Sequence, residues 1–413
     1  MKNPIYEHTH IVHHHPDSSI YLFVHNVIKM MWASMISLFI PSFLYTYVWL
    51  DIRQIMIFMA VMSFSNLSIG IFVGWPLLQR YWPKIMMIIG TFFFALYLWV
   101  LYLSKIYYNF VFIAPLFAWI YTWLFWVSFH YNNAIIRTHT KNFGTTYTNF
   151  AIFSNIGIAF GPFVWWFLTT YYDVSWMVGV AMILVLLSIL PLVLYKEDTS
   201  IVKNTNYSIK SFFRHLYLLI QEQKTKVIYK TFAVVSYNNV VASIIWPLLI
   251  FLFVHDFQKI WIIGSATTIG TIIVLYIIGK IDKDANKTYI KISTLIQSWN
   301  WNIWAISTIL WLLVSPLIMM IDVIQKVLSN VNDNTIDKFF FDYADNDYKD
   351  NKIYPVLLRE IGIHGTKILL FLFLALLYYY FPVSTFTLVL PMIVTITLVT
   401  LSRSIIKSTD NNK

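Results

Sequence analysis

The feature that most constrains this chain is a repeated run of about 20 apolar residues, separated from the next by a short polar break. A run of that length crosses the hydrocarbon core of a bilayer as an α-helix, which satisfies its own backbone polar groups. Ile85–Leu103 and Met177–Leu194 are continuously apolar and lack the alternation of a transmembrane β-strand. Hydrophobic residues make up 59% of the chain and charged residues only 12%, which a larger soluble core does not explain. The sequence therefore predicts an all-α polytopic membrane protein.

The polar breaks divide the chain into about twelve predicted transmembrane helices. The expected spans are 21–48, 54–78, 84–104, 109–131, 145–170, 174–195, 231–254, 258–279, 288–312, 315–333, 357–380 and 383–402.

The lysines and arginines are distributed unequally between alternate loops. If the N-terminus lies in the cytoplasm, the short outer loops hold only Arg53, Lys105 and Lys259, whereas the inner loops and tails hold most of the 29 cations. Cytoplasmic loops carry such an excess, so both termini are expected inside, in a multi-pass protein of the plasma (inner) membrane. The net charge of +10 then reflects topology, and we expect no nucleic-acid partner. The N-terminus lacks the pattern of a cleaved signal peptide, so the first helix is expected to stay as an anchor.

Two polar stretches give the domain organisation. We expect a cytoplasmic linker at 196–230 to divide a six-helix bundle at 21–195 from a second at 231–402, with cytoplasmic tails at 1–20 and 403–413. Within the linker, Ser211–Ile220 could form a helix along the membrane surface. A second polar insert, at 332–355, is rich in aspartate.

No metal or cofactor is predicted. The chain has no cysteine, which excludes disulfides and thiol chemistry. The tail contains a histidine group that could bind a metal ion, but it forms no evident closed tetrahedral set. These residues are His8, His10, His13, His14 and His15.

Two short basic loops occur at corresponding positions. Residues 74–84 join the second and third predicted helices, and residues 279–287 join the eighth and ninth. Arg80 and Lys283 in these loops lie 203 residues apart, close to half of the 413. This spacing favours two repeated halves, as in many transporters.

These loops resemble the Gly-x-x-x-Asp-Arg-x-Gly-Arg-Arg pattern of the major facilitator superfamily. The first loop keeps Arg80 and Lys84 but has Gln79 at the acidic position and Trp82 at the inner glycine. The second keeps the acidic residue and two cations, namely Asp282, Lys283 and Lys287. The resemblance covers the whole chain in helix count and loop pattern. It implies two six-helix bundles that rock about a central site.

The fifth predicted helix carries a further likeness to that superfamily. Gly157, Gly161 and Pro162 match the first part of a Gly-x-x-x-Gly-Pro-x-x-Gly-Gly motif found in its exporters, and Trp165 and Trp166 replace the last two glycines. Glycines four residues apart let a neighbouring helix approach closely. The resemblance implies export.

Polar residues inside predicted spans are the candidates for substrate binding or coupling, because they are costly in a bilayer. Asp322 and Lys326 are four residues apart and can pair, and Glu360 shares a helical face with His364 and Lys367. The candidates are His25, Asn26, Lys29, Asn238, Asn239, Asn300, Asp322, Lys326 and His364. Asp322 is the expected coupling carboxylate and Glu360 the second; uniport is the alternative.

Structural interpretations remain open for the same residues. Asp322 and Lys326 could form a structural ion pair, and asparagines often bridge helices. Lys29 could extend along its helix to the inner surface. Arg359 and Glu360 could be interfacial.

The superfamily resemblance also implies a cytoplasmic gate. It places the loop after the second helix against the inner end of the eleventh, and the loop after the eighth against the inner end of the fifth. The expected pairs are Arg80 with Glu360 and Asp282 with Arg137 or Lys141. The remaining candidates are Lys84, Lys283 and Arg359.

The function predicted from these features is secondary transport of a small solute by alternating access, by a monomer in the lipid bilayer. We find no phosphate-binding loop, zinc-protease motif or nucleophile elbow, so the chain is not expected to be an enzyme. A polytopic lipid or sugar transferase and a transport-inactive receptor are the alternatives. The sequence does not identify the solute, and proton or ion coupling is an expectation only.

Overall fold

The computed structural model describes most of the first half of the chain and parts of the second. The described residues are 19–37, 39–69, 82–132, 143–172, 174–195, 209–246, 248, 265–273, 299–300, 302–303, 306, 320–329, 336, 340, 353–384, 387 and 390–391. All regular secondary structure within these residues is helical. The expected all-α polytopic fold class is confirmed.

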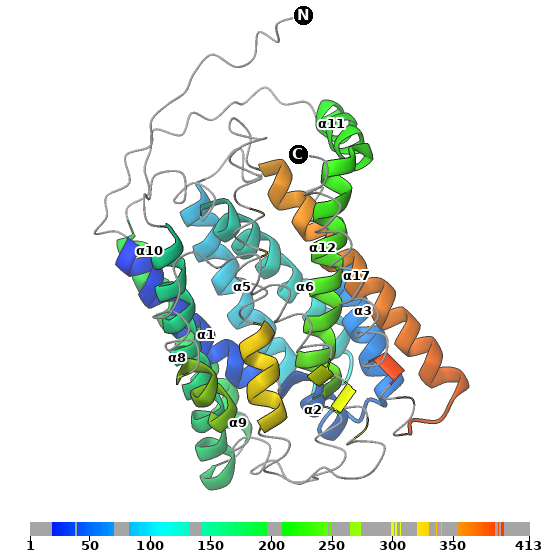
Figure 1. Cartoon of the computed structure of the whole chain (residues 1–413). Coiled ribbons are helices and arrows are strands. Elements are labelled where there is room, and N and C mark those ends of the chain that lie inside the picture. Colours follow the sequence, from blue (N-terminus) through cyan, green and yellow to red (C-terminus); the bar gives the residue numbers. More distant parts are fainter. Residues whose placement is uncertain are drawn as a thin grey trace, which may run out of the picture.

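The helices follow the predicted spans closely in the first half of the chain (Figure 1). They are α1 (Ser19–Ser37), α2 (Phe39–Thr46), α3 (Ile52–Ile69), α5 (Pro83–Leu103), α6 (Phe110–Thr122), η3 (Trp123–Val127), α8 (Phe143–Tyr171), α9 (Val174–Leu187) and α10 (Ile189–Leu194). In the second half they are α11 (Ile209–Gln221), α12 (Gln223–Val240), η4 (Val241–Ile245) and α17 (Ile353–Tyr380). Residues 265–273 and 320–329 are also helical.

The expected linker differs from the structure in one respect. Residues 209–221 form α11, as the amphipathic pattern predicts, but α12 already begins at Gln223, eight residues before the expected span at 231. The first turns of α12 contain Lys224, Lys226 and Lys230. A span read from apolar residues stops at such cations, whereas a helix with lysines continues, because lysine is a good helix former.

Two π-helical turns interrupt otherwise α-helical spans. One, η3, follows α6 and is continued by helical residues up to Asn132; the other, η4, follows α12. A π turn accommodates one extra residue in an α-helix and often occurs at functional sites.

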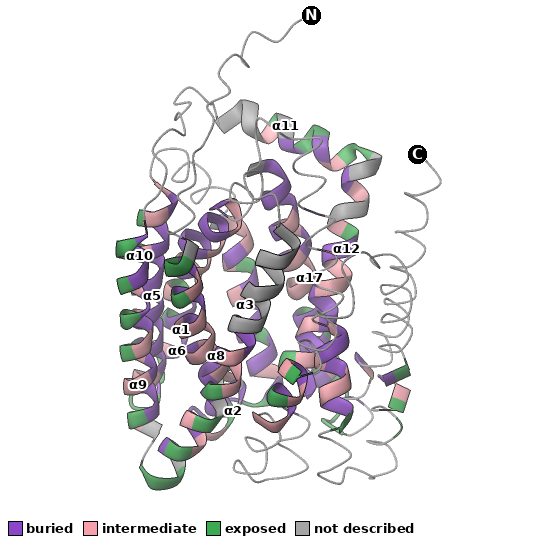
Figure 2. Ribbon diagram, turned by 60° about the vertical axis from the view of Figure 1, so that its left-hand side comes forward, coloured by how far each residue is buried: buried purple, intermediate pink, exposed green. Residues whose placement is uncertain are grey.

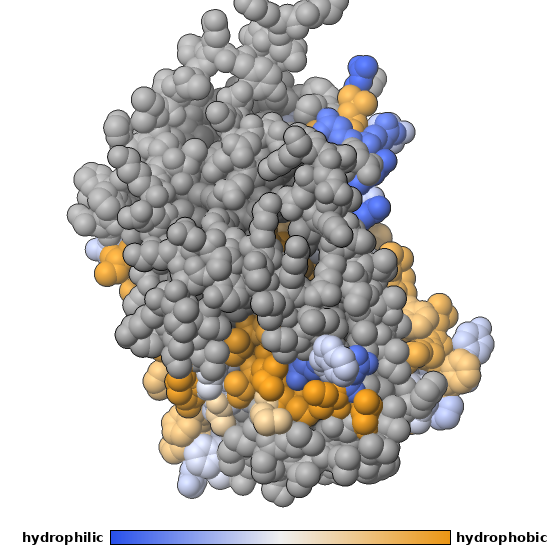
Figure 3. Space-filling view, in the orientation of Figure 1, coloured by the Kyte–Doolittle hydropathy of each residue, from blue (hydrophilic) through white to orange (hydrophobic). Residues whose placement is uncertain are grey.

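The outer surface of the helices is apolar. Phe92, Trp99, Ile183 and Leu369 are each at least half exposed, which in water would be costly but in lipid is not. Four described helices are long and apolar enough to cross a bilayer: Pro83–Leu103, Phe110–Asn132, Ser175–Leu194 and Tyr354–Tyr380. Figure 2 shows exposed residues along the outside of α9 and α10 and buried residues facing inward. In Figure 3, hydrophobic side chains gather across the lower part of the molecule and hydrophilic ones over α11.

The core joins elements from both ends of the chain. In the largest buried cluster, Met56 and Met59 of α3 and Phe371 and Leu374 of α17 are grouped together. Helix α3 packs against both α6 and α17, and α17 packs against α12. Helix α17 therefore contacts the first part of the chain as well as its own half.

Glycines allow the closest helix approach, between α1 and α8. A Cβ atom built on Gly161 would lie 2.9 Å from the backbone N of Met35 and closer still to the Ser34 Oγ, and one on Gly157 would overlap the Val27 carbonyl. The two helices can pack at this separation only because these positions have no side chain. The predicted glycine contact therefore exists, with α1 as the partner; Pro162 lies in the same helix.

Candidate functional site

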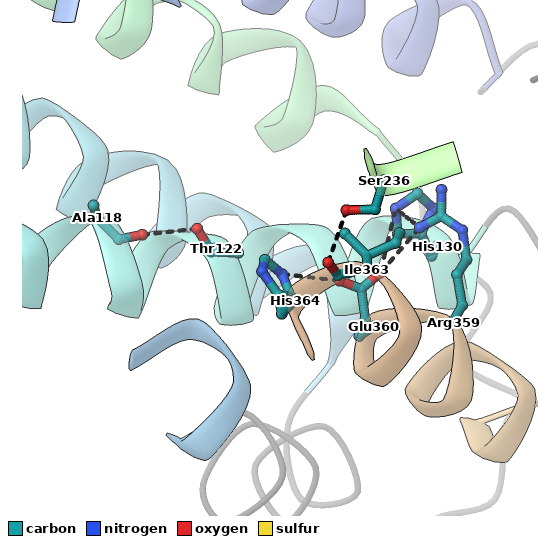
Figure 4. A network of polar contacts seen from close by, with 8 residues as sticks. All are labelled: Ala118, Thr122, His130, Ser236, Arg359, Glu360, Ile363 and His364. Carbon is teal, nitrogen blue, oxygen red and sulfur yellow. Dashed lines mark hydrogen bonds and ion pairs between the residues drawn. The ribbon is translucent and has the colours of Figure 1, made fainter. Parts of the chain in front are cut away.

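A cluster of charged and ionisable side chains is buried between α17 and the helix that follows η3. We call Arg359, Glu360 and His364 of α17, together with His130, the Glu360 cluster (Figure 4). The Glu360 side chain is 6% exposed, and its carboxylate accepts from the Arg359 guanidinium at 3.0 Å. Its other oxygen lies 3.3 Å from the His364 Nε2. Buried charges persist only when paired in this way.

His130 joins the cluster from the first half of the chain. Its Nε2 lies 2.6 Å from the Arg359 Nη1 and 3.9 Å from the Glu360 Oε1. A guanidinium can only donate, so the His130 Nε2 accepts, and the neutral ring carries its proton on Nδ1. The contact between the two halves is thus an Arg-to-His hydrogen bond beside a carboxylate.

Apolar and backbone contacts hold the cluster in position. The His130 ring stacks on Trp126 with centroids 5.5 Å apart, and the Arg359 guanidinium lies 5.2 Å from the Phe232 ring centre. Ser236 of α12 donates to the Ile363 carbonyl of α17 at 2.8 Å. Each part of the cluster is therefore held by neighbours from its own half of the chain, and the two parts contact each other through Arg359 and His130.

A second polar group lies on α1. The His25 Nδ1 is 2.7 Å from the Ser188 carbonyl, and Asn26 donates from Nδ2 to the Ser154 hydroxyl of α8. Lys29 is 1% exposed, so it does not extend to the surface and the structure excludes that interpretation. Its Nζ lies over the rings of Phe125, Trp126 and Phe129, at 4.8, 4.2 and 4.4 Å from their centres.

A third polar group is formed by amides in the second half. Asn238 of α12 donates to Ser329 at 3.1 Å, and Asn300 donates to the Gln325 side chain at 3.1 Å and to the Ile321 carbonyl at 3.2 Å. The Gln325 Nε2 lies 3.5 Å from the Asn238 Oδ1. Asn26, Asn238 and Asn300 thus bridge helices, which is their structural interpretation.

The remaining binding candidates have simpler surroundings. Asp322 and Lys326 form the predicted ion pair at 3.2 Å, with side chains 11% and 37% exposed. Asn239 is half-buried and its carbonyl accepts from Ser243. The i, i+4 pair of Glu360 and His364 is as the sequence predicts. Glu360 is buried, and the Arg359 side chain is 13% exposed.

Most of the expected gate residues cannot be placed. Arg80, Arg137, Lys141, Asp282 and Lys283 lie outside the described residues, as do the N-terminal histidines and most of the 332–355 insert. Lys84 donates to the Val193 and Tyr195 carbonyls at 2.7 and 2.6 Å. In this structure it caps the end of α10.

His130 is absent from the candidates based on sequence. The sequence signal for His130 is an ionisable side chain inside the predicted span 109–131, since such side chains mark functional positions in membranes. No charged sequence neighbour accompanies it, because its partners come from α17. Among the described residues, no group of three or more His, Cys, Asp or Glu could hold a metal ion.

Comparisons with known proteins identify the fold. No protein-family model matches the chain, and a search of curated proteins finds no match. The crystal structure of the nucleoside transporter NupG matches with a TM-score of 0.64 and 11% sequence identity, over 95% of this chain and 99% of that chain. A crystal structure of a point variant of NupG matches with a TM-score of 0.68 and 10% identity, over 94% and 99%. At these identities the likeness establishes the fold: the chain is a polytopic helical membrane protein folded like this transporter.

Proposed function

We propose that this chain is a secondary transporter that moves a small polar solute by alternating access between two six-helix bundles. The observation that carries the proposal is the Glu360 cluster, where His130 of one proposed bundle meets Arg359 and Glu360 of the other in a largely buried contact. The fold likeness to a nucleoside transporter supports the same function.

The chemistry of the contact suits a reversible latch. Apolar packing between bundles loses its stabilisation when the bundles separate, whereas charged groups regain water as the gap opens. The contact that parts is one hydrogen bond from the Arg359 guanidinium to His130, and such a bond contributes about 1.5–3 kcal/mol, so the open and closed states can lie close in free energy. Glu360 keeps Arg359 and His364 on its own helix in either state, which limits the charge left unpaired on opening.

Finer properties of the proposal come from the sequence. The superfamily resemblance and cation distribution support a major-facilitator-type monomer in the inner membrane with cytoplasmic termini. The fifth-helix motif supports efflux. Glu360 and Asp322 are the carboxylates proposed for proton or ion coupling, and the Arg80–Glu360 and Asp282 gate pairs remain part of the proposal.

Flux through purified protein in proteoliposomes tests the function. Uridine, adenosine and a panel of sugars and organic acids serve as radiolabelled probes in counterflow, with Glu360→Gln as the impaired variant. Saturable counterflow of at least one probe, reduced about tenfold or more in Glu360→Gln, is expected. Lys105→Gln, in an exposed loop, is the control. Binding of a probe without flux would instead favour a transport-inactive receptor.

A further inference from the structure

Three polar atoms on one face of α1 have no hydrogen-bond partner among the described residues. They are the Lys29 Nζ, the His25 Nε2 and the Asn26 Oδ1. All three residues are at most 1% exposed. Positions 25, 26 and 29 fall within an arc of about 100° on a helix. Unsatisfied buried polar atoms are costly, so a group of three on one face points to a ligand.

Each of the three atoms has a defined hydrogen-bonding character. The His25 Nδ1 faces a carbonyl, so it donates, and the Nε2 of the neutral ring is left as an acceptor. Asn26 donates from Nδ2 to Ser154, which leaves its Oδ1 as an acceptor. Lys29 offers only donors on a positive charge. The face therefore complements a solute with an anionic group beside hydroxyl or N–H donors.

The charge around this face is unbalanced. His130 lies within electrostatic range of Lys29, Arg359 and Glu360, and Lys367 acts on the same carboxylate. Among these residues three basic side chains, those of Lys29, Arg359 and Lys367, accompany one carboxylate. Asp322 does not contribute, because it pairs with Lys326. A low-dielectric site with surplus positive charge favours an anion.

The aromatic rings hold Lys29 without neutralising it. Phe125, Trp126 and Phe129 attract its ammonium through their faces, which carry only partial charge. Trp126 and Phe129 also contact the His130 ring, with centroids 5.5 and 5.7 Å away. Lys29 is thus one ring away from the contact that breaks when the proposed latch opens.

We propose that Lys29 binds the anionic group of the transported solute, and that the solute is a small organic anion with hydroxyl or N–H groups received by His25 and Asn26. This inference rests on the proposed function, because the solute reaches α1 when the bundles separate.

Matched pairs of probes test the charge. Purified protein in detergent is titrated with glucuronate against glucose, glycerate against glycerol, and uridine monophosphate against uridine, and thermal stability is recorded. We expect the anionic member of at least one pair to raise the unfolding temperature more than its neutral partner. Lys29→Met should weaken that binding about tenfold or more, whereas Lys29→Arg should retain it within a few-fold.

The variants keep the test independent of folding. Lys29→Met replaces a buried basic side chain with an apolar one of similar size, so the ligand-free chain should be as stable as the wild type or more stable. Lys105→Gln, in an exposed loop, should not change binding. A wild type that no anion stabilises over its neutral partner, or a Lys29→Met chain that binds anions equally well, would overturn the inference.

The two proposals fail in different ways. Saturable counterflow of a neutral probe without anion binding would leave the transporter standing and remove the anion site. Anion binding that depends on Lys29, with no counterflow of any probe in proteoliposomes, would leave Lys29 as an anion-binding residue and remove the transporter.

Discussion

Glu360 is the residue on which most contacts of the candidate site converge. It accepts from Arg359 and lies within ion-pair distance of His130 and His364, at 6% exposure. A buried carboxylate with several partners cannot be removed alone, because its cationic partner would remain desolvated. Charge pairing within the cluster can therefore be measured through stability, independently of transport.

Glu360→Gln should lower the free energy of unfolding by about 3–5 kcal/mol, because it removes the buried carboxylate that the Arg359 guanidinium and the His364 ring contact. The double variant Glu360→Gln with Arg359→Gln should recover most of this loss, since neither charge remains. Thermal unfolding in detergent of the wild type, the two single variants and the double variant gives the coupling energy between Glu360 and Arg359. Additive losses in the double variant would show that the pair contributes nothing.

Contacts of the candidate residues could be predicted from the sequence where both partners lie on the same helix. The pairs Asp322–Lys326 and Glu360–His364 follow from the spacing of four residues. The place of His130 in the site could not be predicted, because its contact with Arg359 joins residues 229 positions apart. The burial of Lys29 could not be predicted either. The aromatic rings over it come from another helix, and sequence spacing alone does not place that helix beside α1.

At the scale of elements, small residues set how closely the helices approach. The α1–α8 contact was visible in the spacing of Gly157 and Gly161, but the partner helix was not. Gly362 does the same for α17, since a Cβ atom there would lie 2.7 Å from the Tyr229 carbonyl of α12. The sequence does not distinguish Gly362 from Gly365, three residues later. The structure distinguishes them, because Gly362 faces α12 and Gly365 has nothing within 4 Å of an added Cβ atom.

Gly161→Ala should destabilise the protein by about 1–3 kcal/mol, because the added methyl group overlaps α1. Gly179→Ala is the matched control in α9, where nothing lies within 4 Å of the added Cβ. The control should be neutral or slightly stabilising, since alanine favours helices. Equal thermal stabilities for both variants would contradict close packing at Gly161.

Gly362→Ala should likewise lower stability, with Gly365→Ala as the control in the same helix. Because Gly362 lies between Glu360 and His364, the variant should also reduce counterflow. A Gly362→Ala protein with normal stability would show that α12 can move aside at no cost.

At the scale of the whole molecule, the proposal requires the two ends to open in turn. The sequence contains no cysteine, so spin-label pairs can be introduced without removing native thiols. Leu194 and Lys230 are exposed near one end of the bundles, and Tyr107 and Phe381 near the other. Each pair joins one residue from each half of the chain.

Distances within the two pairs should change in opposite directions when a transported solute is added. Double electron–electron resonance measures the distance distribution within each pair. Glu360→Gln should shift the distribution of the Leu194–Lys230 pair toward longer distances. Distances that stay fixed in both pairs, or that lengthen together, would contradict alternating access.

The π-helical turn at η3 has a consequence for how the latch depends on chain length. One residue added to an α-helix turns everything after it by about 100°, and His130 follows this turn by three residues. Because the π turn takes up its extra residue locally, deleting one residue within Trp123–Val127 would restore a regular helix and leave His130 facing Arg359. Deleting Ser128 or Phe129, beyond the turn, would instead rotate His130 by about 100° away from Arg359, with no charged residue altered. The register of one helix, counted in residues, is therefore as much a determinant of the latch as the chemistry of its side chains.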